Sequence, residues 1–211
     1  MRDLRPLVLV VDDDESIRNS LDWLLTSSGY DVATFASGGE ILAQTSTTSA
    51  HCLLIDVCLP DMTGLRVRQE CSLRGLDVAT VFITAYDDVD VGVQAMKGGA
   101  EDFLLKPFDD AAVLDAVRRA IARELLSRRE RHEATEIAER YQAMTPRQQE
   151  VCERVVAGRL NKQIAAELGM CEQTVKVHRS RVMHKMRVAS VADLVRTVDR
   201  YHRLNEGAMG A

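Results

Sequence analysis

The chain has 211 residues, of which 46% are hydrophobic and 28% are charged, and its formal net charge is −5. This composition is that of an ordinary soluble globular protein with room for one large or two ordinary domains. No apolar run approaches the roughly 18–20 residues that a membrane helix requires, so we expect no membrane contact. The first residues lack the pattern of a secretory signal, and five cysteines without C-x-x-C spacing predict reduced thiols in the cytoplasm.

The charge is divided unevenly along the chain. Residues 1–125 hold 11 Lys and Arg against 21 Asp and Glu, whereas residues 145–211 hold 12 against 7. An acidic front and a basic back predict two domains with different partners. A polyanion such as nucleic acid is a candidate partner for the basic part.

Strands and helices are predicted to alternate through the front of the chain. Short apolar runs are each followed by apolar residues at helical spacing, with glycine as a frequent stop. The predicted strands are 7–11, 32–35, 52–55, 78–83 and 102–105, and the predicted helices are 17–28, 38–45, 63–75, 88–98 and one that begins near 108. This order predicts an α/β fold, a doubly wound five-stranded parallel sheet with helices on both faces.

Polar residues stand at the carboxyl ends of these strands, where open parallel sheets bind their ligands. They are Asp12 and Asp13 after the first strand, Asp56 after the third, Thr84 after the fourth, and Lys106 and Pro107 after the fifth. Clustered carboxylates repel one another unless a cation is present, and hard oxygen ligands suit Mg²⁺. An Asp side chain can also accept a phosphoryl group as an acyl phosphate. Taken singly, an acidic triplet is more often a solvated helix start, and a Lys-Pro pair is more often a turn.

Four segments within residues 5–125 resemble the receiver domain of two-component response regulators. They are Val-Val-Asp-Asp-Asp at 10–14, Leu-Ile-Asp-Val-Cys-Leu-Pro-Asp-Met-Thr-Gly-Leu at 54–65, Val-Phe-Ile-Thr-Ala at 81–85, and the run from Ala95 to Phe108 that contains Lys-Pro. The resemblance implies that residues 1–125 form a receiver domain of flavodoxin-like fold. It also implies that Asp56 accepts a phosphoryl group from a cognate histidine kinase.

The same resemblance assigns roles to the residues around Asp56. Mg²⁺ would be bound by Asp12, Asp13, Asp56 and the backbone carbonyl of Cys58. Lys106 would pair with the phosphoryl group, Thr84 would hydrogen-bond to it, Phe103 would turn inward when Thr84 moves, and Pro107 would follow a cis peptide bond. Cys58 and Tyr86 are expected to affect the lifetime of the phosphoryl group, in a direction that the sequence leaves open.

Phosphorylation is expected to change one face of the receiver. It adds charge and acceptor oxygens, and it can shift a two-state protein only by binding one state better than the other. Thr84 and Lys106 are the groups that could make contacts in one state only. We expect the face formed by residues 88–98, 102–105 and 108–125 to form a homodimer when Asp56 is phosphorylated.

Residues 126–144 form a predicted helical linker. The segment holds four basic and four acidic residues without Gly or Pro, and its apolar residues Ala134, Ile137, Tyr141 and Met144 recur at helical spacing. A solvated charged helix and a coiled-coil seam are equally open. Thr145 and Pro146 are expected to end it and to begin the next helix.

Four helices are predicted in the basic back of the chain, at residues 145–157, 161–168, 172–186 and 191–204. Ala165, Gly169 and Val175 have the spacing of a helix-turn-helix, in which glycine permits the left-handed turn and the two other side chains pack the helices together. The third helix is rich in basic residues. We therefore expect an all-α DNA-binding domain over residues 145–205, followed by a disordered tail at 206–211.

The stretches 160–169 and 174–186 resemble the LuxR-type helix-turn-helix, and with the receiver the whole chain resembles a FixJ/NarL-type transcription factor. The resemblance implies that the helix 171–186 enters the major groove of double-stranded promoter DNA, where Lys176, Val177 and Ser180 read base edges. Candidates for backbone contact are Lys162, Thr174, His178, Arg181 and Lys185, and Arg179 adds positive charge to the same helix. For His178, a surface or packing role is equally open. RNA polymerase is a further candidate partner.

Three other functions compete with this interpretation. A phosphatase with an aspartate nucleophile needs a second carboxylate two residues later, and Cys58 at that position argues against an enzyme. A ligand-gated regulator with the same DNA-binding module would not need the acidic residues. A regulator whose phosphorylation is vestigial stays open.

Overall fold

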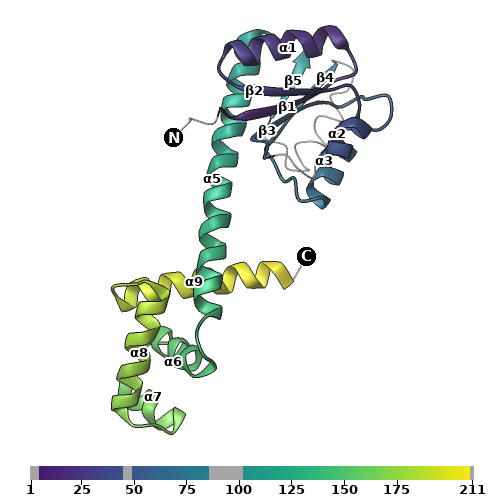
Figure 1. The fold of residues 1–211 in the computed structure, drawn as a ribbon. Helices are drawn as coiled ribbons and strands as arrows, with labels where there is room; N and C mark the ends of the chain where they lie inside the picture. Colours follow the sequence, from purple (N-terminus) through teal and green to yellow (C-terminus); the bar gives the residue numbers. More distant parts are fainter. Residues whose placement is uncertain (1–4, 45–48, 86–101, 210–211) are drawn as a thin grey trace. The chain divides into compact units, whose positions relative to one another are not determined.

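The structure is a computed structural model that describes residues 5–44, 49–85 and 102–209 (Figure 1). The chain divides into two compact units, Met1–Ser127 and Arg128–Ala211. The predicted helix at 88–98 and Tyr86 lie outside the described residues. In the part of the chain that is described, no helix combines the length and apolar character needed to cross a membrane.

The first unit is built on a five-stranded sheet in the order β2-β1-β3-β4-β5, with all neighbouring strands parallel. The strands are β1 Leu7–Val11, β2 Asp31–Phe35, β3 Cys52–Asp56, β4 Thr80–Ala85 and β5 Asp102–Lys106. This confirms the predicted parallel sheet. β4 is shifted by two residues from its predicted position: it begins at Thr80, because Val78 is buried without strand pairing, and it extends to Ala85.

Helices cover both faces of this sheet. They are α1 Glu15–Ser27, α2 Gly38–Gln44, α3 Gly64–Leu73 and the first part of α5 Asp110–Gln142 (Figure 1). One buried cluster joins the sheet to α2 and α3, and the other joins it to α1 and α5. β3 lies between these two clusters with all five residues buried, which explains its continuous apolar sequence.

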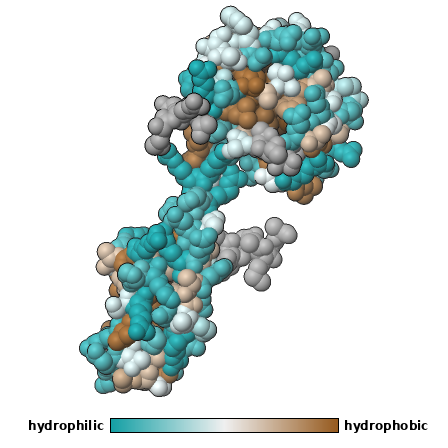
Figure 2. Space-filling model, in the orientation of Figure 1, coloured by the Kyte–Doolittle hydropathy of each residue, from teal (hydrophilic) through white to brown (hydrophobic). Residues whose placement is uncertain are grey.

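The second unit contains α6 Pro146–Val156, α7 Asn161–Leu168, α8 Glu172–Met186 and α9 Val191–Met209. The bounds of α7 and α8 are those predicted from the sequence, and Gly169 between them has a φ of +63°. Thr145 begins α6 with a capping box in which its side chain accepts from Gln148 N–H, and Pro146 occupies the first turn. Hydrophilic side chains predominate on the visible face of each unit (Figure 2).

The helix α9 continues further than the sequence predicts. It extends to Met209, so part of the tail expected to be disordered is helical. A single glycine, Gly207, lies in this extension, and one glycine costs a helix only about 1 kcal/mol relative to alanine. The absence of proline in this stretch lets the helix run on.

The end of α5 belongs to the hydrophobic core of the second unit. Ile137, Tyr141 and Met144 are buried there, and the rings of Tyr141 and Tyr201 stack with centroids 4.2 Å apart. The hydroxyl of Tyr141 donates a hydrogen bond to Glu153, and burial together with this carboxylate raises the pKa of the tyrosine. The last turns of α5 are therefore not a solvated helix, because their apolar residues pack against their own unit.

Candidate functional site

The carboxyl ends of three strands bring an acidic cluster and a lysine together in the first unit. Asp12 follows β1 directly, and Asp56 is the last residue of β3. Oxygen atoms of Asp12, Asp13 and Asp56 all lie within 4.8 Å of one another. Lys106, the last residue of β5, reaches the same place, so the structure assembles residues that lie up to 94 positions apart.

Lys106 joins two of the three carboxylates. Its Nζ donates a hydrogen bond to Asp12 Oδ2 at 2.9 Å and a second one to Asp56 Oδ2. Burial lowers the pKa of Lys106, but its hydrogen bonds to the two carboxylates outweigh that effect and raise the pKa. The lysine is therefore a fixed cation, held beside the oxygens of Asp56.

Asp12 and Asp13 differ in their surroundings. Asp12 is fully buried, and burial raises its pKa despite the hydrogen bonds from Lys106 and from the backbone of Asp14. The Asp14 N–H to Asp12 Oδ1 distance is 2.9 Å, which fixes the rotamer of the buried side chain. Asp13 is exposed. A buried carboxylate that resists ionisation, next to an exposed one, is a donor set that a divalent cation would stabilise.

The backbone packs closely around Asp56 and leaves no space for a side chain at Gly64. The amide of Cys58 donates to Asp56 Oδ1 at 2.9 Å, while the other carboxylate oxygen contacts Lys106. A Cβ at Gly64 would lie 2.2 Å from the carbonyl oxygen of Asp56, closer than real side chains approach backbone. Glycine at the start of α3 therefore lets this helix pass directly behind the aspartate.

The remaining receiver residues lie on β4 and β5. Thr84 is fully buried near the end of β4, and Phe103 on β5 is half-buried and packs against the core cluster that includes Phe82. The peptide bond between Lys106 and Pro107 is cis, as the resemblance implies. Each predicted receiver residue within the described part of the chain is thus on this sheet or in a loop that follows it.

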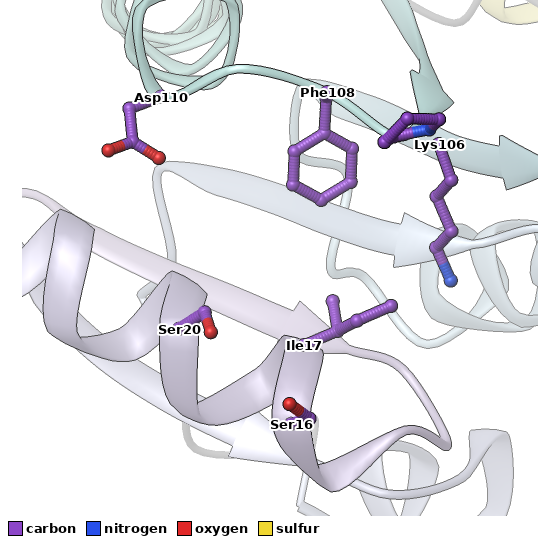
Figure 3. A pocket seen from close by; sticks show the side chains of 7 residues that line it. Ser16, Ile17, Ser20, Lys106, Phe108 and Asp110 are labelled. Atoms are coloured by element: carbon purple, nitrogen blue, oxygen red, sulfur yellow. The ribbon is translucent and has the colours of Figure 1, made fainter.

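A cavity that no sequence motif predicts opens beside the Lys106 end of the cluster. Its volume is about 510 Å³, and it is lined by Ser16, Ile17, Ser20, Lys106, Pro107, Phe108 and Asp110. Figure 3 shows Ser16, Ile17 and Ser20 on α1 facing Phe108 across the opening. The cavity depends on tertiary contact between α1 and the start of α5, so no local sequence pattern predicts it.

The second candidate site is the helix α8. Val175, Val182 and Met186 are fully buried along one side of this helix. Lys176, Val177, Ser180 and Arg181 are exposed, as is Lys162 on α7. Because buried and exposed residues alternate at helical spacing, α8 presents a largely polar face to the surroundings.

Several basic residues predicted to contact DNA have partners inside the second unit. Arg179 Nη1 donates to Asn161 Oδ1 at 3.0 Å, and Lys185 Nζ donates to the carbonyl oxygen of Ala143 at 2.7 Å. The hydroxyl of Thr174 lies 3.1 Å from the thiol sulfur of Cys171. Among the described residues, no hydrogen-bond partner reaches the buried Nδ1 atom of His178.

Two family models match separate parts of the chain. Residues 8–118 match the response regulator receiver domain, and residues 142–198 match the LuxR family of bacterial regulatory proteins. Nodulation protein W of Bradyrhizobium diazoefficiens is 42% identical over 192 residues, which cover 91% of this chain and 85% of that protein. The transcriptional regulatory protein FixJ of Azorhizobium caulinodans is 40% identical over 189 residues, which cover 90% of each chain.

Solved structures show the same architecture. The low-resolution structure of the response regulator StyR matches with a TM-score of 0.82 at 38% identity, over 93% of this chain and all of the other. Full-length FixJ from B. japonicum matches with a TM-score of 0.59 at 33% identity, over 94% of this chain and 98% of the other.

Proposed function

The chain belongs to the two-component response regulators that join a receiver domain to a LuxR-type DNA-binding domain, and we propose that phosphorylation of Asp56 controls its binding to DNA. Members of this family are transcription factors rather than enzymes. The receiver implies a histidine kinase as partner, and the LuxR-type domain implies DNA. We assign residues 1–125 to the receiver and 145–205 to the DNA-binding domain, with 126–144 between them.

The observation that carries the proposal is the contact of Asp56 with Lys106 inside the carboxylate cluster. An oxygen of Asp56 would attack the phosphorus of a phosphohistidine. The P–O bond forms as the P–N bond breaks, and the imidazole leaves. Lys106 would exchange its contact with the carboxylate for one with a phosphoryl oxygen, which keeps the lysine charge paired throughout.

The donor set fits Mg²⁺, and we assign Asp12, Asp13, Asp56 and the backbone carbonyl of Cys58 as the groups that would hold it. Oxygen donors of this kind are the ligands that Mg²⁺ prefers. When bound, the ion would neutralise negative charge between the carboxylates and the incoming phosphoryl group. Asp13 is exposed and can complete the ligand set without moving buried atoms.

Thr84 and Phe103 would carry the signal away from the pocket. A phosphoryl group on Asp56 offers new acceptor oxygens, and Thr84 near the end of the neighbouring strand would donate its hydroxyl to one of them. Phe103 is half-buried on β5, next to β4, so a shift of Thr84 changes the space open to its ring. We propose that this change exposes a dimerisation face that includes β5 and α5.

The DNA-binding half would act through the exposed face of α8 on promoter DNA in the cytoplasm. Lys176, Val177 and Ser180 would read base edges, while Arg181 and Lys162 would contact phosphates. The other candidates for contact with DNA lie in the internal surroundings described above, and they are Thr174, His178, Arg179 and Lys185. A dimer would place two such helices on two half-sites, and RNA polymerase is a further proposed partner.

Beryllofluoride with Mg²⁺, a phosphoryl mimic, tests this proposal on the full chain. We expect the wild type to shift from monomer to dimer in sedimentation and to bind promoter DNA more tightly. Asp56→Ala should show neither change. If the wild type stays monomeric and its DNA affinity does not move, phosphorylation at this site is vestigial and the proposal fails.

A further inference from the structure

The carboxylate of Asp61 joins two segments that lie far apart in the sequence. Asp61 Oδ2 accepts a hydrogen bond from Gly39 N–H at 2.7 Å, and Oδ1 accepts one from Gly38 N–H at 3.1 Å. The two amides belong to the first turn of α2, whereas Asp61 lies in the loop between β3 and α3. The Gly39 N–H and the other backbone amides around this carboxylate hold the pKa of Asp61 below its usual value, so the side chain stays ionised.

The start of α2 is seated directly on this loop. A Cβ at Gly38 would lie 2.6 Å from a side-chain carbon of Val67 and 2.7 Å from one of Met62. These distances are shorter than real contacts, so only glycine lets α2 approach so closely. The Asp61 hydrogen bonds therefore act across an interface that is already tightly packed.

The loop itself is closed at its base. Cys58 and Thr63 form an isolated antiparallel bridge, and the amide of Gly64 donates to the carbonyl of Val57 at 2.9 Å. The amide of Cys58 also donates to Asp56 Oδ1. With its base held by these bonds and its tip held by Asp61, the loop has few ways to move.

Helix capping alone does not account for Asp61. α2 already has local caps, because the Ser37 hydroxyl accepts from Glu40 N–H at 3.2 Å and the Glu40 carboxylate accepts from Ala36 N–H at 2.7 Å. Asp61 reaches the same turn from 22 residues further along the chain. Such a long-range contact restrains the loop as well as the helix.

We propose that Asp61 is a positioning residue for the divalent metal site, acting by fixing the loop that carries the backbone carbonyl of Cys58. This inference rests on the proposed function, in which that carbonyl is a metal ligand. A backbone carbonyl can be placed only by the conformation of its own segment. Outer contacts that orient metal ligands commonly change metal affinity by about 10- to 100-fold when they are removed.

Calorimetric titration of the full chain with Mg²⁺ tests the inference, with the urea midpoint of the receiver measured on the same samples. We expect Asp61→Ala to weaken Mg²⁺ binding by about tenfold. Asp61→Asn keeps one acceptor oxygen and should fall between this variant and the wild type. Glu40→Ala is the matched control, since it removes the same charge and a capping bond from the same turn without touching the loop.

Each outcome decides the matter. If Asp61→Ala lowers the urea midpoint but binds Mg²⁺ as tightly as Glu40→Ala does, Asp61 is a cap only and the inference is wrong. Should Asp61→Ala fail to fold, the affinity of Asp61→Asn decides in the same way. If the wild type binds no Mg²⁺, or if Asp13→Asn binds Mg²⁺ with the affinity of the wild type, the proposed metal site itself is refuted.

Discussion

In the phosphoacceptor pocket the functional side chains satisfy one another, whereas on α8 they are divided between the unit's own interior and its surface. Lys106 is shared by two carboxylates, and Asp56 has contacts on both of its oxygens. On α8, Lys176 and Arg181 are exposed while Arg179 and Lys185 hydrogen-bond within the unit. The charged side chains of the pocket are therefore paired with one another, whereas α8 keeps part of its basic side chains exposed to solvent.

This difference follows from where each site is built. Strand ends converge on one point, so residues from three strands meet and their charges must be balanced locally. A helix on the surface must bury one side and offers the other to solvent, so its roles are set by angular position. Substitutions in the pocket should consequently disturb structure and charge balance together. Substitutions on the exposed side of α8 should disturb DNA binding alone.

The largest expected effect comes from Gly64→Ala behind Asp56. The added Cβ would lie 2.2 Å from a backbone oxygen, and we expect the receiver to lose about 3 kcal/mol of unfolding free energy. Urea denaturation measures this loss. Gly75→Ala is the control, because it has open space around it and only its φ of +84° costs about 1 kcal/mol. Equal losses of unfolding free energy from the two variants would show that the backbone around Asp56 packs less tightly against Gly64 than we infer.

A smaller effect is expected from Lys176→Ala on α8. Loss of a base contact should cost about 1–3 kcal/mol of binding free energy on the target promoter and much less on random DNA. Fluorescence anisotropy on both DNAs measures the difference. Lys162→Ala is the control and should weaken both DNAs alike. An equal loss on both DNAs from Lys176→Ala would contradict its base-reading role.

Asp12→Asn should stabilise the receiver by about 1 kcal/mol at pH 7 in the absence of metal. Burial raises the pKa of Asp12, so the folded state favours the protonated carboxyl, and stability is lost as the pH rises through that pKa. The advantage of Asn should therefore shrink as the pH falls below it. Urea midpoints at several pH values, in EDTA, measure this. Asp13 is exposed, so Asp13→Asn, the control, should change the urea midpoint little. If Asp12→Asn lowered the urea midpoint at pH 7, the predicted direction of the effect would be wrong.

The smallest effect is expected from Lys185→Ala. Its Nζ donates to the Ala143 carbonyl, so we expect a loss of about 0.5 kcal/mol of stability and a smaller change in the salt dependence of DNA binding than an exposed lysine or arginine would give. Arg181→Ala, on the exposed side, should lower the salt slope by about one unit. A similar drop in slope for Lys185→Ala would instead support the phosphate contact that the sequence suggests.

The sequence predicts what depends on local pattern. Alternating runs place the strands, and the residues after each strand identify Asp12, Asp56 and Lys106, because parallel strands bring their carboxyl ends together. The bounds of α7 and α8 follow from helical spacing and from Gly169.

What the sequence could not predict depends on tertiary contacts. Helical spacing marks Ile137 and Tyr141 as a buried face, but it does not say which partner buries them. The Asp61 bonds to α2 and the Lys185 bond to Ala143 join segments 22 and 42 residues apart. No periodicity in the chain encodes such pairs.

The most direct test is the intact mass of the full chain after incubation with acetyl phosphate and Mg²⁺. We predict that the wild type gains the mass of one phosphoryl group, that Asp56→Ala gains none, and that chelation of Mg²⁺ prevents the gain. A wild type that gains no mass with any phosphoryl donor, or a gain that persists in Asp56→Ala, would contradict the account.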